Sequence, residues 1–196
     1  MSALRAIFDC LRALPTQWLT AAVLTAFAAV IVLGYVQTYV GAAVTEKTGL
    51  GLVALQFSGW SPHWPATTHS AKILAEWKEA GVLGDARRAQ LVDFFFAAGY
   101  GTLALLLAGT LWRCHPLAET GGGRWTWLIA LGALAAVFDE VENVSMWRLL
   151  SGHETAGWLW LLPTCAAVLK FALLGVGLAT LIVALVRLAP SPESPR

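Results

Sequence analysis

The chain has 196 residues, of which 58% are hydrophobic and only 13% are charged, and its formal net charge is +1. A soluble domain carries about 25% charged residues, so this composition predicts an integral membrane protein. The near-neutral charge excludes the basic surface that nucleic-acid binding requires, and we expect no nucleic-acid partner. Cys10, Cys114 and Cys165 lack the spacing of metal ligands, which favours free thiols.

Long uncharged runs predict an all-α, polytopic membrane protein with a four-helix transmembrane bundle. The expected helices occupy residues 18–40, 86–112, 125–147 and 157–188. We expect Asp85 to form the N-cap of the second helix and Pro163 to interrupt the fourth.

The first run has a competing interpretation as a secretory signal. Arg5 and Arg12 precede the apolar residues, and Gly41-Ala42-Ala43 resembles a cleavage site. The length of the apolar run favours a membrane span instead.

Residues 41–85 form the predicted extramembrane cap between the first and second helices. Within it, residues 70–80 predict an amphipathic helix that lies on the membrane surface or over the mouth of the bundle. The apolar face of that helix consists of Ile73, Leu74 and Trp77. The bundle and the cap make a single domain over residues 1–190, and a disordered tail is expected at residues 191–196.

The third predicted helix carries acids inside its membrane span. Its uncharged run from Trp125 ends at Phe138, which is too short to cross a bilayer that needs roughly 20 helical residues. Extension to Trp147 gives a suitable length with Trp at both ends, the residue that anchors helices at membrane interfaces. The stretch Asp139-Glu140-Val141-Glu142 therefore lies within the span, where each charge costs at least ~2.5–3.5 kcal/mol unless it is paired, protonated or hydrated.

Helical periodicity places Asp139, Glu142 and Asn143 on one face, at positions i, i+3 and i+4, and Glu140 elsewhere. Lys170 in the fourth helix and Asp93 at the start of the second apolar run are expected at a similar membrane level. The sequence thus predicts a polar cavity that is closed near Lys170 and open toward the cap. The predicted ligand-binding residues are Asp93, Tyr100, Asp139, Glu142, Asn143 and Lys170.

Each of these residues also has a structural interpretation. Asp139 and Lys170 could form a buried ion pair that fixes helix register, and Asn143 could bond to a neighbouring helix. Asp93 could lie at the head-group boundary. One lysine cannot neutralise three acids, so at least one carboxyl group is expected to be protonated or to hold an exogenous cation or ligand.

We predict no metal and no cofactor. Carboxylate metal centres in helix bundles add a His at the third position after a Glu, and the nearest His residues here are expected outside the membrane. The nucleophile motif GxSxG and the zinc motif HExxH are both absent.

Short motifs stand on three of the predicted helices: Asp93-Phe94 with Tyr100, Asp139-x-x-Glu142-Asn143, and Lys170-Phe171. Together they resemble a recurring group of bacterial four-helix integral membrane proteins of similar length. That group has no assigned activity, so the resemblance implies a topology and candidate residues only. The chain is also similar, much more distantly, to the emopamil-binding and sterol-isomerase proteins, whose histidine and glutamate motifs do not stand at matching positions here.

These observations predict a protein of the bacterial inner membrane that binds a lipid-like or amphiphilic small molecule, with its head group among the polar residues. In an enzymatic version, Glu142 or Asp139 donates a proton and the other accepts one. The basic residues of the short loops favour a cytoplasmic location for both termini.

The alternative is a non-catalytic subunit or assembly factor of a membrane protein complex. Glu140, Trp147 and the apolar face of residues 70–80 would then contact a membrane-protein partner, and self-association into a homo-oligomer is a related expectation. A proton-coupled transporter is disfavoured, because four helices without an inverted repeat are poorly suited to alternating access.

Overall fold

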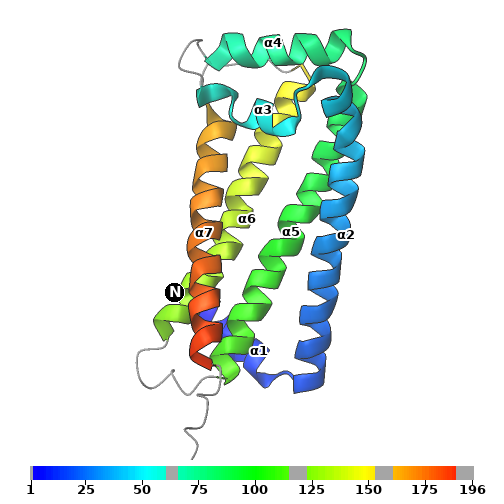
Figure 1. The fold of residues 1–196 in the computed structure, drawn as a ribbon. Helices are drawn as coiled ribbons and strands as arrows, with labels where there is room; N and C mark the ends of the chain where they lie inside the picture. Colours follow the sequence, from blue (N-terminus) through cyan, green and yellow to red (C-terminus); the bar gives the residue numbers. More distant parts are fainter. Residues whose placement is uncertain (1, 61–65, 115–122, 153–160, 189–196) are drawn as a thin grey trace, which may run out of the picture.

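The computed structural model describes residues 2–60, 66–114, 123–152 and 161–188. Four long helices run side by side (Figure 1): α2 (Thr16–Thr48), α5 (Leu83–Cys114), α6 (Gly123–Leu150) and α7 (Leu162–Leu188). One short helix, α1 (Ser2–Ala13), lies at one end of them. The other end is covered by α3 (Leu52–Gln56), η1 (Ser58–Trp60) and α4 (Ala66–Glu79).

Three helices are long and apolar enough to cross a membrane, in the segments Thr16–Thr48, Leu83–Arg113 and Leu162–Val186. They expose large apolar side chains, among them Phe27 and Leu178, which is typical of helices that face lipid. By helix length and composition the chain is therefore an integral membrane protein. Helix α6 is also long and packs between α5 and α7, but the second half of its sequence carries the acids.

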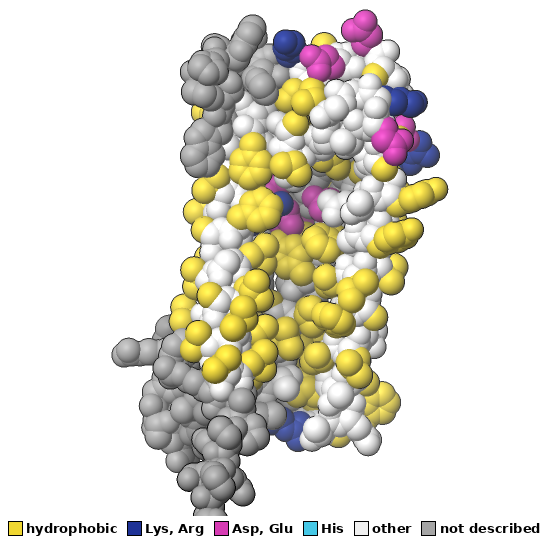
Figure 2. All heavy atoms as spheres, in the orientation of Figure 1, with side chains coloured by type: hydrophobic (Ala, Val, Ile, Leu, Met, Phe, Trp, Pro, Cys, Tyr) yellow, Lys and Arg dark blue, Asp and Glu magenta, His cyan; other side chains and the backbone are white. Residues whose placement is uncertain are grey.

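The long helices pack in chain order. Helix α2 packs on α5, α5 on α6, and α6 on α7, whereas the described parts of α2 and α7 make no comparable contact with each other. The four helices consequently form an open row that curves back on itself. Figure 2 shows the result as a hollow between α7 and α2, lined mainly by hydrophobic side chains.

Small residues bring α5 and α6 close together. A Cβ atom added at Gly101 would lie 2.6 Å from the Cβ of Ala136, and one added at Gly132 would lie 2.8 Å from the Cβ of Ala104. Interfaces of this kind hold membrane helices together through close backbone approach, since lipid removes the hydrophobic driving force between helices. The α5–α6 contact therefore has no room for larger side chains at these positions.

The N-terminal part differs from the sequence prediction in two respects. Helix α1 was not predicted; it packs against α5 and is separated from α2 by Pro15, which cannot continue a helix. Helix α2 continues past residue 40 to Thr48, where Gly49 ends it with a φ of 71°. The sequence Gly41-Ala42-Ala43 lies inside this continuous helix.

Other helix boundaries also differ from prediction. Helix α5 begins at Leu83, so Asp85 lies in its first turn rather than at the N-cap, and it accepts a 2.5 Å hydrogen bond from Arg88. Helix α7 begins at Leu162, which puts Pro163 in the first turn, where proline is tolerated, and not at an interruption. The predicted start of this helix at residue 157 and the predicted tail lie outside the described residues.

The described cap packs over the end of the bundle, one of the two predicted positions. Ile73 and Trp77 of α4 are buried in one apolar cluster with Met146 and Leu150 of α6, and Leu74 packs against that cluster. The predicted apolar face of this helix is confirmed, but Ile73 and Trp77 are buried against the bundle and cannot contact a partner protein.

The close α5–α6 contact predicts the effect of adding one methyl group. Gly101→Ala should lower the free energy of unfolding by about 1–3 kcal/mol, because Ala136 blocks the new atom. Gly175→Ala in α7 is the matched control, since nothing lies within 4 Å of its added Cβ. Thermal unfolding in detergent micelles would measure both variants. Equal stability of the two variants would show that α5 and α6 do not approach this closely.

Candidate functional site

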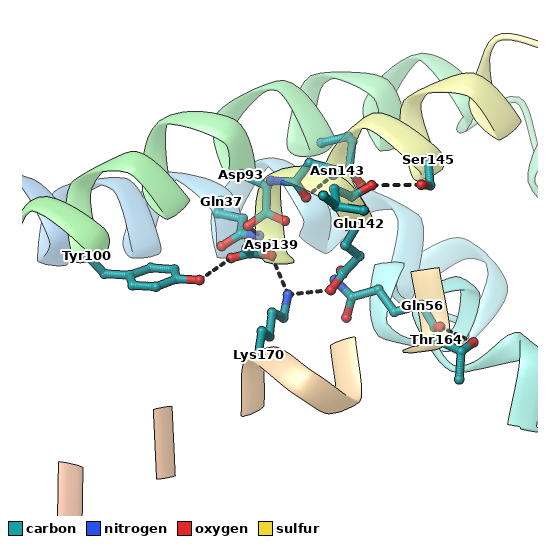
Figure 3. A network of polar contacts seen from close by, with 12 residues as sticks. Gln37, Gln56, Asp93, Tyr100, Asp139, Glu142, Asn143, Ser145, Thr164 and Lys170 are labelled. Carbon is teal, nitrogen blue, oxygen red and sulfur yellow. Dashed lines mark hydrogen bonds and ion pairs between the residues drawn. The ribbon is translucent and has the colours of Figure 1, made fainter. Parts of the chain in front are cut away.

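Polar side chains from all four long helices meet near the cap end of the bundle (Figure 3). All six residues predicted from the sequence are among them. We define the buried polar cluster as these six residues together with two glutamines: Gln37, Gln90, Asp93, Tyr100, Asp139, Glu142, Asn143 and Lys170.

Lys170 lies between two acids of α6. Its Nζ is 2.5 Å from Asp139 Oδ1 and 2.8 Å from Glu142 Oε2, and the three side chains are only 6%, 3% and 0% exposed. The side-chain ring of Phe171 lies next to the ammonium, with its centroid 5.2 Å from Nζ. The expected Asp139–Lys170 pair is present, and Glu142 is a second partner that links α6 more firmly to α7.

Tyr100 connects this ion pair to α5, and Asp93, also on α5, is bonded to α2. The phenol of Tyr100 donates a 2.8 Å hydrogen bond to Asp139 Oδ2. The side-chain amide of Gln37 donates a 2.5 Å hydrogen bond to Asp93 Oδ1. Asp93 is 4% exposed, so it lies inside the protein.

A second part of the cluster lacks a full set of hydrogen bonds. Gln90 donates a 2.6 Å bond to Asn143, and both side chains are fully buried. Within the described part of the chain, Gln90 Oε1, Asn143 Nδ2 and Glu142 Oε1 have no hydrogen-bond partner. Glu142 Oε2 touches Lys170, although the geometry of that contact is that of an ion pair rather than a hydrogen bond.

The cap closes the cluster from one side. Thr164 near the start of α7 donates a 2.6 Å bond to the backbone oxygen of Gln56 and accepts a 3.1 Å bond from the backbone nitrogen of Gly59. The buried side chain of Gln56 points toward Glu142 (Figure 3). In the described part of the cap, the side chain of Gln56 thus occupies the direction in which the sequence predicted an opening.

Part of the cluster can be seen from the side of the bundle that lies between α7 and α2. Figure 2 shows basic and acidic side chains at the cap-side end of the hollow between α7 and α2. The buried charged residues of the described chain are Asp93, Asp139, Glu142 and Lys170. Charged groups of the cluster thus border the apolar hollow, and the cap does not cover this side.

Three residues of the site were missing from the predicted set: Gln37, Gln56 and Gln90. Gln90 stands three positions before Asp93 on the same helical face, which was a usable signal. It was passed over because the apolar run begins only after it. Gln37 lies near the cap-side end of α2, where the sequence places polar residues of the first helix at the level of the cluster. The position of Gln56 depends on how the cap packs, which no local pattern shows.

The acids could in principle hold a metal ion, because Asp93, Asp139 and Glu142 each offer an oxygen within 4.8 Å of the others. The ammonium of Lys170 already contacts two of these carboxylates. A divalent ion bound to the same oxygens would be repelled by that charge at close range. The donor set therefore suits an ammonium group better than a metal.

Tyr100, Asp139, Lys170 and Glu142 form one continuous series of polar contacts. A phenol, two carboxyl groups and an ammonium are thereby held together in a region of low dielectric constant, where hydrogen bonds and charge interactions are strong. Such an arrangement can hold a polar head group, and its acids can exchange a proton with it.

No family model, no curated protein sequence and no solved structure matches this chain. The resemblance to bacterial four-helix membrane proteins therefore stays a prediction. The function has to be argued from the geometry of the cluster.

Removal of the lysine from the ion network should destabilise the protein more than removal of one of its acids. Lys170→Met should lower the free energy of unfolding by about 3–5 kcal/mol, because it leaves two buried acids without the cation that they contact. Asp139→Asn should cost less, since Lys170 keeps Glu142 as a partner. Thermal unfolding in detergent would measure both.

The triple variant Lys170→Met, Asp139→Asn, Glu142→Gln is the test of coupling. It should recover much of the stability lost in Lys170→Met, because no uncompensated charge remains among these residues. A loss in the triple variant as large as the sum of the separate losses would show that the three side chains act independently.

Proposed function

We propose that this protein binds a lipid-like amphiphile taken from the surrounding bilayer. The head group lies in the buried polar cluster, and the hydrocarbon chain lies in the hollow between α2 and α7. We infer that α6 is the fourth membrane-spanning helix, since it packs between α5 and α7 along the bundle. The proposed location is a bacterial inner membrane, with both termini on the cytoplasmic side.

The unpartnered atoms of the cluster are the observation that carries this proposal. Buried polar atoms are nearly always hydrogen-bonded, because leaving one unpaired in a dry interior costs free energy. Glu142 Oε1, Gln90 Oε1 and Asn143 Nδ2 lack such partners in the described structure. A polar head group that enters the cluster would supply them.

The depth of the cluster in the membrane supports a head group. Trp18 and Tyr39 are highly exposed on α2, and such residues are enriched at the two membrane interfaces. At ~1.5 Å per residue they lie about 31 Å apart, close to the ~30 Å thickness of a hydrocarbon core. Gln37, which bonds to Asp93, stands two residues from Tyr39. The cluster is thus proposed to lie a short distance below one interface, within reach of the head group of a lipid-like molecule.

A catalytic extension uses the same residues. Glu142 or Asp139 would transfer a proton to the bound molecule, and the other would accept one, with Lys170 as the electrostatic partner. The alternative role as a subunit of a membrane protein complex loses one of its predicted contact surfaces, because Ile73 and Trp77 are buried against the bundle, while Trp147 stays exposed. Binding is therefore the favoured proposal.

The proposal is tested by native mass spectrometry of gently extracted protein, with analysis of the lipids that co-purify. We expect one amphiphile per chain in the wild type and its loss in Glu142→Gln, which changes the charge and one acceptor atom of the cluster. Glu140→Gln is the matched control, because Glu140 is a half-buried acid of the same helix that has no place in the cluster. A wild-type chain free of any bound amphiphile would overturn the proposal.

A further inference from the structure

The buried polar cluster contains more acid than base. Its ionisable acids are Asp93, Asp139 and Glu142, and Lys170 is its one basic residue. Lys170 contacts Asp139 and Glu142. The partner of Asp93 is the neutral amide of Gln37, and the described residues give it no ion pair. The cluster therefore has an unbalanced acidic group at Asp93.

The acids are also close enough to act on one bound group. One oxygen from each of Asp93, Asp139 and Glu142 lies within 4.8 Å of the others. Two of the unpartnered buried atoms, Glu142 Oε1 and Gln90 Oε1, are hydrogen-bond acceptors. A ligand that carries positive charge and several N–H donors would complement the charge and these two acceptors, while the third unpartnered atom, Asn143 Nδ2, is a donor and needs an acceptor of its own.

Lys170 shows which kind of cation these oxygens accept. Its ammonium sits 2.5 Å and 2.8 Å from two carboxylate oxygens. A divalent metal would place two positive charges beside the ammonium of Lys170, whereas a second ammonium places only one, so the repulsion is smaller for the amine. A quaternary ammonium has no N–H and would leave the acceptors unpaired. A primary ammonium satisfies the charge and the acceptors together.

We propose that the head group of the bound amphiphile is a protonated primary amine that pairs with Asp93. This inference rests on the proposed function and adds the chemical class of the ligand. The amine lies at the cap-side end of the hollow between α2 and α7, and its chain extends along the apolar side chains seen in Figure 2.

The test uses amphiphiles that share one dodecyl chain and differ in the head group. Purified full-length protein in maltoside micelles is titrated with dodecylamine, dodecanol, dodecyltrimethylammonium or dodecyl sulfate at neutral pH, and the Tm is recorded. Dodecylamine should raise the Tm, and the other three should raise it much less. Lauroyl lysophosphatidylethanolamine is added as a fifth probe, because bilayer lipids present the same primary amine beside a phosphate. If only dodecylamine stabilises the protein, the ligand is a simple amine. If lysophosphatidylethanolamine also stabilises it, the site accepts the amine of a lipid head group as well.

The variant Asp93→Asn tests whether the bound amine pairs with Asp93. It should weaken the apparent binding of dodecylamine by about tenfold or more, as expected for one lost charge-assisted hydrogen bond. Glu140→Gln should bind as the wild type does. Unchanged binding in Asp93→Asn would overturn the proposed pairing. If Asp93→Asn does not fold, the comparison of dodecylamine with dodecanol on the wild type decides.

Failure of the amine proposal can be distinguished from failure of the proposed amphiphile binding. Equal stabilisation by dodecanol and dodecylamine would overturn the amine head group and leave the proposed amphiphile binding intact. No stabilisation by any probe, together with no co-purifying amphiphile, would overturn both.

Discussion

The contact of the Lys170 ammonium with Asp139 and Glu142 is the interaction on which the rest of the bundle depends. It joins α7 to α6 at one level, and Tyr100 carries the connection from Asp139 to α5. Charges placed in a nonpolar environment are tolerated only when they are paired, so the position of each helix is set by the need to bring its polar group to this level. The same requirement brings α2 to α5 through Gln37.

Close packing makes that network possible. Small residues let α5 and α6 approach until Gly101 and Ala136 touch, so that short acidic side chains can meet partners on neighbouring helices. The cap contributes from the other side, because Trp77 and its neighbours close the bundle end and Gln56 points toward Glu142. Both features exclude water, which strengthens the interactions among the charges and raises the cost of any atom left unpaired.

The sequence predicted the parts of this site that follow from local periodicity and from the cost of charge in a membrane. Asp139, Glu142 and Asn143 were placed on one face by their spacing, and Lys170 and Asp93 were placed near them by depth along their helices. The described structure brings all of them together. Helix α1, the extra turns of α2 and the side chains of Gln56 and Gln90 were missed. Hydropathy marks where the apolar run stops and not where the helix ends, and the partner of an amide depends on packing between distant segments.

The order of helix packing has a mechanical consequence. Among the long helices, α2 packs extensively only on α5, and Val44 near its end joins the apolar cluster beneath the cap. Its opposite side borders the hollow and makes no extensive contact with the described part of α7. A sideways rotation of α2 about α5 would widen the hollow without separating any other pair of long helices. The bond from Gln37 to Asp93 would resist such a rotation, and it ends on an acid that has no ion pair among the described residues. Access to the cluster and the charge state of one carboxyl group would thus be coupled through a single side-chain amide.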